Sequence, residues 1–278
     1  MSGLSLFWQR YRRNRPAVGG LVVLGLVVLA AAFGPLAYGI DPFDMAGRPS
    51  TLPSARFPLG TDVSGRDILA GLLAGARVSL LIGIAASLTA TLIGFAVGAT
   101  AGYVGGWLDA ILMRVTDFFL TIPSFVFAVL IVAIFRPSVA VITLAIAAVS
   151  WPSVARLARA EFVSQRHREY VSACRAMGMG RLEIMLRQIL PNALPPVVVI
   201  GSLTVASAIL AEAGLSFLGL GDPNIVSWGY MIGVARTVLR TAWWMSAIPG
   251  VTILVTVLAI NLVGEGLNEA LNPRMRPR

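Results

Sequence analysis

The side chains able to do chemistry are few in this sequence, and their spacing argues against catalysis. His167 is the only histidine, Cys174 is the only cysteine, and all 22 basic residues are arginine. A zinc protease site needs paired histidines, and a phosphate-binding P-loop needs a lysine. We find no Gly-x-Ser-x-Gly elbow and no convincing carboxylate dyad. We therefore expect a protein that is not an enzyme, has no metal or cofactor of its own, and does not hydrolyse ATP by a P-loop.

Acidic residues beside apolar runs are the next candidates, because a carboxylate at membrane depth is costly unless it is paired and often marks an ion pathway. Asp117 lies one helical turn after Arg114, so we expect a local ion pair there. Glu212 and Glu265 fall at the ends of apolar runs, where we expect water or lipid headgroups to reach them. The centres of the runs carry no acidic residue, which argues against a proton-coupled carrier.

The elements that position these residues are membrane spans. The chain is 57% hydrophobic and only 13% charged, whereas a soluble domain carries about 25% charged residues. A span needs about 20 apolar residues. The charge-free runs of roughly this length or longer are 17–38, 78–108, 118–135, 137–155, 188–211 and 241–264. We therefore predict an all-α, polytopic membrane protein with six transmembrane helices. The first run is too long for the core of a signal peptide.

The arginines predict the orientation. With the N-terminus inside, most of them flank the spans on the cytoplasmic side, as the positive-inside rule requires. The net charge of +9 therefore indicates topology and lipid headgroups, and we expect no nucleic-acid partner. The predicted organisation is a cytoplasmic N-terminal segment (1–16), a first helix (17–38), an extracytoplasmic loop (39–77), a core (78–266) with a cytoplasmic loop (156–191), and a cytoplasmic tail (267–278).

The cytoplasmic loop concentrates charge in a chain that otherwise has little. Tyr170, Cys174 and Met177 recur at i, i+4 and i+7, which predicts a short amphipathic helix with Cys174 as a structural thiol. Gly178 and Gly180 follow, and glycines permit the positive φ that ends a helix and turns the chain.

A second short helix is predicted after this turn. Glu183 and Arg187 are spaced for an i, i+4 ion pair, and Pro191 is expected to end the helix. Its predicted apolar stripe consists of Leu182, Met185, Leu186 and Ile189. Periodicity leaves two alternatives open: the two helices rest in the lipid interface, or they dock in a groove on a soluble partner.

Two further patterns concern the core and the opposite face. Ser64 is expected to cap a short extracytoplasmic helix, with Asp67 completing a capping box. The run 78–108 is rich in Gly, Ala, Ser and Thr. Such small residues indicate tight helix packing, a smooth path for a solute, or both.

The loop resembles the "EAA" loop of binding-protein-dependent ABC transporter permeases, whose pattern is roughly E-A-A-x-x-x-G-x9-I-x-L-P. Ala173, Gly178, Leu190 and Pro191 match it, while Ser172, Cys174 and Gln188 replace the glutamate, the second alanine and the isoleucine. Further stretches are similar to the second-type permease of the dipeptide/oligopeptide/nickel class. They are FPLGTDVSGRD (57–67), GARVSLLIG (75–83), AGYVGGWLD (101–109), WPSVARLARAEF (151–162), ILPNALPP (189–196), EAGLSFLGLG (212–221), SWG (227–229) and NLVGEGLNEALNPR (261–274).

This resemblance implies a type I ABC importer permease fold in a prokaryotic plasma (inner) membrane. It also implies a second homologous permease, two ATP-binding subunits that bind the ATP and Mg, and an extracytoplasmic solute-binding protein. The helix around 169–177 would be the coupling helix in the ATPase groove. The implied contact residues are Arg168, Glu169, Ser172, Ala173, Cys174, Arg175, Met177, Gly178, Leu190 and Pro191.

The implied solute is a dipeptide or oligopeptide, with nickel, glutathione or another small solute as alternatives. A secondary carrier and a membrane scaffold protein are the competing classes. A carrier would need an intramembrane ionisable residue, and a scaffold would need neither the glycine turn nor the proline at this spacing.

Overall fold

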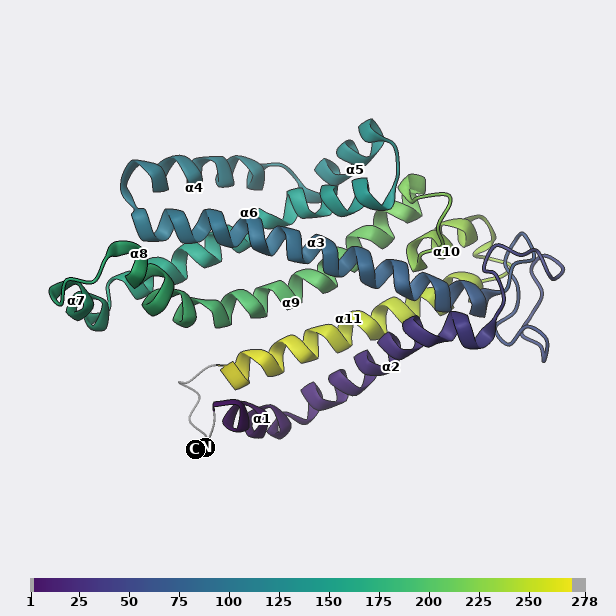
Figure 1. Cartoon of the computed structure of the whole chain (residues 1–278). Helices are drawn as coiled ribbons and strands as arrows, with labels where there is room; N and C mark the ends of the chain where they lie inside the picture. Colours follow the sequence, from purple (N-terminus) through teal and green to yellow (C-terminus); the bar gives the residue numbers. More distant parts are fainter. Residues whose placement is uncertain (1–2, 272–278) are drawn as a thin grey trace.

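The structure, a computed structural model, describes residues 3–271 and is a bundle of long helices (Figure 1). Within this range the only β feature is an isolated bridge between Thr61 and Asp67. The elements are α1 (Gly3–Arg13), α2 (Arg15–Tyr38), α3 (Ile68–Val104), α4 (Gly106–Thr121), α5 (Ser124–Phe135), α6 (Val139–Arg166), α7 (Glu169–Ala176), α8 (Arg181–Glu183), η1 (Ile184–Ile189), α9 (Leu190–Leu215), η2 (Ser216–Leu220), α10 (Trp228–Ala235), η3 (Arg236–Val238) and α11 (Trp244–Leu271).

Five helices are long and apolar enough to cross a membrane: α2, α3, α6, α11 and the continuous helix Arg181–Leu220. A sixth span results if α4 and α5 are counted together, although they are bent by 84°. The prediction of one straight helix over 118–135 is therefore wrong. Pro123 explains the break, because the residue before a proline avoids the helical region, and Ile122 is extended, with φ −85° and ψ 128°.

Helix α3 begins at Ile68, ten residues before the predicted span. Its cap is Asp67, whose carboxylate accepts hydrogen bonds from the N–H groups of Leu69 and Ala70. The prediction of Ser64 as the cap of a separate short helix is wrong. The residues before Asp67 form an irregular loop instead, in which the Asp62 carboxylate accepts the N–H groups of Ser64 and Arg66.

Small residues let α3 and α6 approach closely. Gly94, Gly98 and Gly102 repeat every four residues on α3, and each faces the backbone of α6. A Cβ on Gly94 would lie 2.5 Å from the Trp151 carbonyl oxygen, and one on Gly98 would overlap the Ala155 carbonyl oxygen. Tight packing is therefore confirmed on this face of α3.

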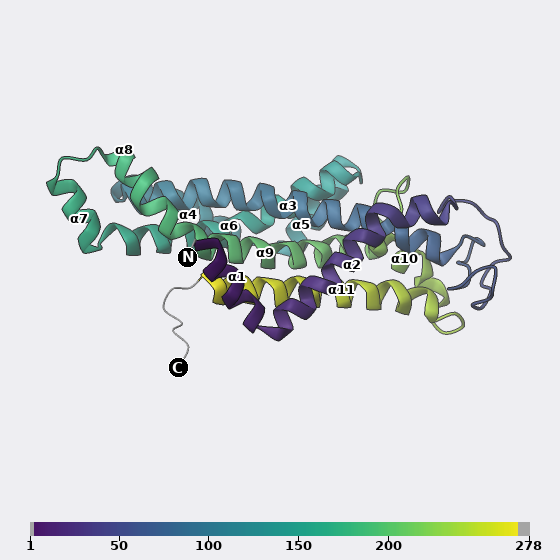
Figure 2. The same ribbon diagram turned by 60° about the horizontal axis from the view of Figure 1, so that its bottom comes forward.

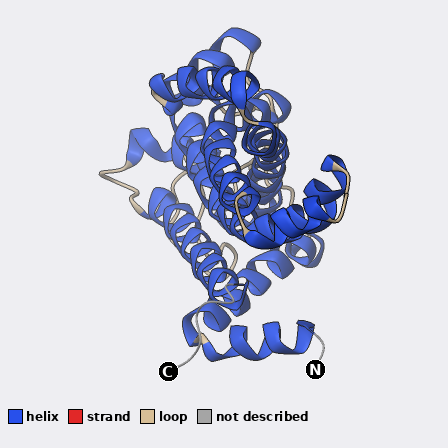
Figure 3. Ribbon diagram, turned by 90° about the vertical axis from the view of Figure 1, so that its left-hand side faces the viewer, coloured by secondary structure: helices blue, strands red, loops and turns tan. Residues whose placement is uncertain are grey.

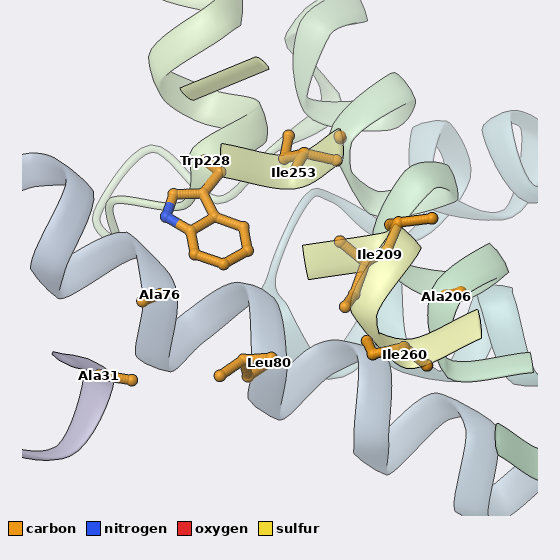
Figure 4. Close-up of a cluster of buried hydrophobic side chains, with 10 residues drawn as sticks. Ala31, Ala76, Leu80, Ala206, Ile209, Trp228, Ile253 and Ile260 are labelled. Carbon is orange, nitrogen blue, oxygen red and sulfur yellow. The ribbon is translucent and has the colours of Figure 1, made fainter. Parts of the chain in front are cut away.

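Helix α10 is folded back into the bundle. Its Trp228 is 1% exposed and packs in a cluster with Leu80 of α3, Ile209 of α9 and Ile253 of α11 (Figure 4). The Trp228 indole Nε1–H donates a hydrogen bond of 3.0 Å to the Leu72 carbonyl. Helix α10 therefore joins three of the long helices at one end of the bundle.

The two ends of the bundle differ. Helices α7 and α8 project at one end, here called the α7 end, while α10 and the irregular segment between α2 and α3 lie at the other, the α10 end (Figure 1). The two described ends of the chain, in α1 and α11, lie near each other toward the α7 end (Figure 2). Seen from the α7 end, α1 lies at the edge of the bundle (Figure 3).

Candidate functional site

Gly178 closes α7 through hydrogen bonds that define a Schellman motif. Its φ is +80°, its N–H donates to the Arg175 carbonyl, and the Met179 N–H donates to the Cys174 carbonyl. The predicted positive φ at Gly178, which ends the helix and turns the chain, is confirmed. A Cβ on this residue would meet no atom within 4 Å, so the backbone conformation alone demands glycine. Gly180 has a φ of −65° and makes no such demand.

The inner face of α7 is held on the bundle by its own side chains. Val171 and Cys174 are buried and pack in a cluster with Phe162, Ile184 and Ile189. The structural role of the Cys174 thiol is confirmed by this burial. The predicted stripe is confirmed at Tyr170, which is partly buried and packs against the same cluster, and it is wrong at Met177, which is 73% exposed.

The outer face of α7 has no covering element among the described residues. This face, here called the α7 outer face, consists of Arg168, Glu169, Ser172, Ala173, Arg175, Ala176, Met177 and Gly178, all of them exposed. It contains seven of the ten predicted contact residues. Of the other three, Cys174 points into the bundle, Leu190 is half-buried, and Pro191 is exposed beside a groove. A projecting helix whose outer face no described element covers is available for contact with another protein.

The second half of the loop is packed differently from the prediction. Ile184 and Ile189 are its buried residues, whereas Leu182 and Leu186 are exposed. The predicted stripe is confirmed at Ile189 and at Met185, which is partly buried against the same cluster, and it is wrong at Leu182 and Leu186. Residues 184–189 are π-helical, which widens the turn and brings Ile184 and Ile189, five positions apart, onto one face. The Arg187–Glu183 ion pair is confirmed, at 2.8 Å.

The prediction that Pro191 ends a helix is wrong. Pro191 lies where η1 passes into α9. The residues on both sides of this junction keep helical φ and ψ, and the π-helical segment η1 directly precedes the proline. Helices α8, η1 and α9 therefore form one continuous helix from the loop into the bundle.

Side-chain bonds fix the loop to the neighbouring helices. The Tyr103 hydroxyl at the end of α3 donates to the Arg181 carbonyl, and the Arg166 guanidinium donates to the Tyr103 carbonyl at 3.1 Å. The Tyr170 hydroxyl donates to the Gln165 side chain at 3.0 Å. These bonds connect the loop to α3 and α6.

Two grooves follow α6 and α9. The first, here called the central groove, has a volume of about 490 Å³ and lies beside the bend between α4 and α5. Its polar side chains are hydroxyls, among them Ser150 and Ser153 on α6 and Thr204 and Ser207 on α9, and its lining includes no charged residue. Hydroxyls and apolar side chains give a surface that can pass a polar solute without holding it by charge.

The second groove, here called the vestibule, has a volume of about 710 Å³ and lies at the α7 end. Its lining comes from α6, α9 and α11, with Arg168 and Tyr170 from the loop. On α9 the two linings adjoin, since Val199 belongs to the vestibule and Ile200 to the central groove.

Ion pairs join α4 to α6. Arg159 holds Asp109 at 2.6 Å, and Arg156 holds Asp117 at 2.7 Å. The predicted pairing of Asp117 with Arg114 is therefore wrong. The sequence distance favours the local partner, but the close approach of α4 and α6 brings Arg156 within reach.

Glu212 is the main residue that sequence reasoning misplaced. It is 1% exposed, so the expectation that water reaches it is wrong. Its carboxylate accepts hydrogen bonds from the hydroxyls of Ser216 at 2.7 Å, Ser227 at 2.6 Å and Ser79 at 3.4 Å. Ser227 caps α10, so this network ties α10 to α9 and α3. Ser216, four residues after Glu212, was the one partner that helical spacing could have indicated. Ser79 and Ser227 are distant in the sequence and could not have been found in this way.

Glu212→Ala is expected to lower stability by about 2 kcal/mol, because it leaves three serine hydroxyls without their acceptor in a buried site. Glu212→Gln keeps one acceptor oxygen and is expected to cost less than half as much. Thermal unfolding of the purified protein in lipid measures both. The control is Glu265→Ala, at an exposed position. Equal midpoints for Glu212→Ala and the control would contradict a structural role for the network.

Residues 90–277 match the family described as "Binding-protein-dependent transport system inner membrane component", and residues 2–53 match "N-terminal TM domain of oligopeptide transport permease C". The chain is 42% identical over 283 residues to the di/tripeptide transport system permease protein DppC of Pseudomonas aeruginosa, covering 99% of this chain and 93% of that one.

The dipeptide transport system permease protein DppC of Escherichia coli K12 is also 42% identical, over 99% of this chain and 95% of that one. Among solved structures, a chain of the MetNI methionine ABC transporter in an inward-facing conformation superposes with a TM-score of 0.62. The two are 18% identical, and the match covers 73% of this chain and 96% of that one. This likeness shows a shared fold.

Proposed function

The chain belongs to the family of binding-protein-dependent transport system inner membrane components and has the type I ABC importer permease fold; from this premise we propose that it is one of two permease subunits of an ATP-driven importer of dipeptides and short oligopeptides. The names of its relatives support peptides as the solute. Its proposed partners are a second homologous permease, two ATP-binding subunits and an extracytoplasmic solute-binding protein.

The observation that carries the coupling role is the projecting α7. Its inner face is fixed by Val171 and Cys174, its outer face is exposed, and Gly178 sets the direction of the chain beyond it. We assign the part of the α7 outer face from Glu169 to Gly178 to the groove of an ATP-binding subunit, with Glu169 and Arg175 as its polar contacts, because Arg168 lines the vestibule. The α7 end is then cytoplasmic and the α10 end extracytoplasmic, in agreement with the distribution of the arginines.

Coupling follows from the same contacts. Closure of the ATP-binding dimer moves the groove that holds α7, and the buried side chains of α7 pass the movement to α6 and α9. Because these two helices line the central groove, their relative movement opens or closes a path for the solute. The absence of charged side chains in that lining leaves selection to the solute-binding protein.

Purification of the tagged chain from its native membrane tests the proposal. We expect a second permease and two ATP-binding subunits to co-purify, and the reconstituted complex to take up radiolabelled dialanine only with ATP and its binding protein. Recovery of the chain alone, still transporting under an ion gradient without ATP, would contradict the proposal and favour a secondary carrier.

A further inference from the structure

The vestibule has the chemistry of a binding site for a small zwitterion. Its volume of about 710 Å³ falls in the range of ligand pockets, about 300–1,000 Å³. Its lining contains one acidic and one basic residue, Glu161 and Arg168. The remaining polar side chains are mostly neutral amides, which can both donate and accept hydrogen bonds. Such a lining complements a molecule with one ammonium, one carboxylate and amide groups between them.

Among the described residues, Glu161 and Arg168 have no side-chain partner. Within residues 3–271 the ion pairs join Asp109, Asp117 and Glu183 to arginines, and neither Glu161 nor Arg168 takes part. Their side chains make no hydrogen bond in this part of the chain either. Arg168 is oriented so that it lines the vestibule, although sequence reasoning placed it at the ATPase contact.

The amides leave much of their hydrogen-bonding capacity unused. The Gln165 oxygen accepts from Tyr170, and the Asn192 amide nitrogen donates to the Gln188 carbonyl. Among the described residues, the side-chain amides of Gln188 and Asn268 have no hydrogen-bond partner. A peptide group in the vestibule would find both donors and acceptors there.

The position of the vestibule identifies the ligand. It adjoins the central groove along α9 and opens at the α7 end, so a solute leaving the central groove toward that end meets it first. Resting on the proposed function, we infer that the vestibule is a release site for the transported peptide, with Glu161 binding its α-ammonium and Arg168 its carboxylate.

Protection of an engineered thiol tests this inference. Ser164 is an exposed residue of the vestibule lining, so Ser164→Cys gives a reporter that a soluble maleimide can reach. Cys174 is buried, and the chain without the reporter gives the background rate. The complete transporter is reconstituted without ATP, with the α7 end facing the medium, and labelling of this chain is followed with dialanine or with N-acetyl-dialanine amide, which has neither charge.

Dialanine is expected to slow the labelling, and the uncharged analogue is not. In the reporter background, Glu161→Gln and Arg168→Gln should each raise the dialanine concentration for half-protection about threefold, the effect of one partly exposed ion pair. The matched control Glu265→Gln removes a carboxylate from α11 outside the vestibule and should leave that concentration unchanged. Because no ATP is present, these readouts do not depend on coupling through α7.

Equal protection by the two compounds, or an unchanged half-protection concentration in Glu161→Gln, would overturn the release site. ATP-driven uptake of dialanine by the reporter variant is measured alongside. Normal uptake without protection refutes the release site and leaves the proposed function standing. Absent uptake by the wild-type transporter refutes the proposed function, whereas protection measured without ATP still reports on the vestibule alone.

Discussion

Gly178→Val is expected to reduce ATP-driven peptide uptake about tenfold while the amount of chain in the membrane stays unchanged. The φ of Gly178 is +80°, and a residue with a Cβ is disfavoured there by about 1–2 kcal/mol, more when it is β-branched. A difference of about 1.4 kcal/mol shifts an equilibrium tenfold. The turn that orients α7 would therefore be populated less. Uptake and ATP hydrolysis by reconstituted transporter, measured together, would show whether stimulation of hydrolysis by loaded binding protein is lost with uptake.

The same turn supplies two controls. Gly180→Val makes the identical change two residues away, where φ is −65° and a Cβ meets no atom within 4 Å, so uptake should be near wild type. Gly178→Asn should retain most activity, because asparagine tolerates the left-handed region. Equal loss in both valine variants would show that bulk on the loop, and not the conformation of Gly178, causes the defect.

Gly98→Val is expected to prevent stable assembly of the bundle, at a cost of at least about 3 kcal/mol, the upper part of the range for overpacking. A Cβ at this position would overlap the Ala155 carbonyl oxygen and crowd the Ala158 side chain. Because the first of these atoms is backbone, α6 as a whole would have to move away from α3. The yield of monodisperse protein after extraction and its thermal midpoint measure the effect.

Gly25→Val on α2 is the matched control, since a Cβ there meets no atom within 4 Å. It adds the same isopropyl side chain to another membrane helix and should leave both the yield and the thermal midpoint close to wild type. Equal behaviour of the two variants would contradict the close packing of α3 on α6.

Composition and motif spacing predicted the helical class, the positions of most spans and the glycine turn. These features depend on local properties: runs of apolar residues, and a backbone conformation at Gly178 that glycine alone adopts readily. Pro123 was readable in the same way, because its effect on Ile122 is local. The bend was not predicted because the span 118–135 was defined by the absence of charge, and hydropathy does not distinguish a straight helix from a bent one.

The wrong predictions share a different cause. Asp117 pairs with Arg156 and Glu212 accepts from Ser79 and Ser227, partners that become neighbours only when separate helices pack. In the second half of the loop Ile189 is buried as predicted, but the π-helical turn shifts burial from Leu182 and Leu186 to Ile184. A helical period of 3.6 residues cannot anticipate that shift. Long-range contacts and departures from regular helix therefore set the limit of what this sequence revealed.

Because η1 passes into α9 without a break, a movement of the loop in the proposed importer would tilt α9 as a whole. The helix continues through Pro195 and Pro196 as far as Leu215, and its 26 residues extend about 39 Å. If such a rod tilts by about 10° around its midpoint, each end moves by about 3 Å, and the two ends move in opposite directions. When α7 moves in one direction, the far end of α9, near the Glu212 network, would then move in the opposite direction. In the proposed importer, such a tilt would narrow the path at one end of α9 while it widens the path at the other.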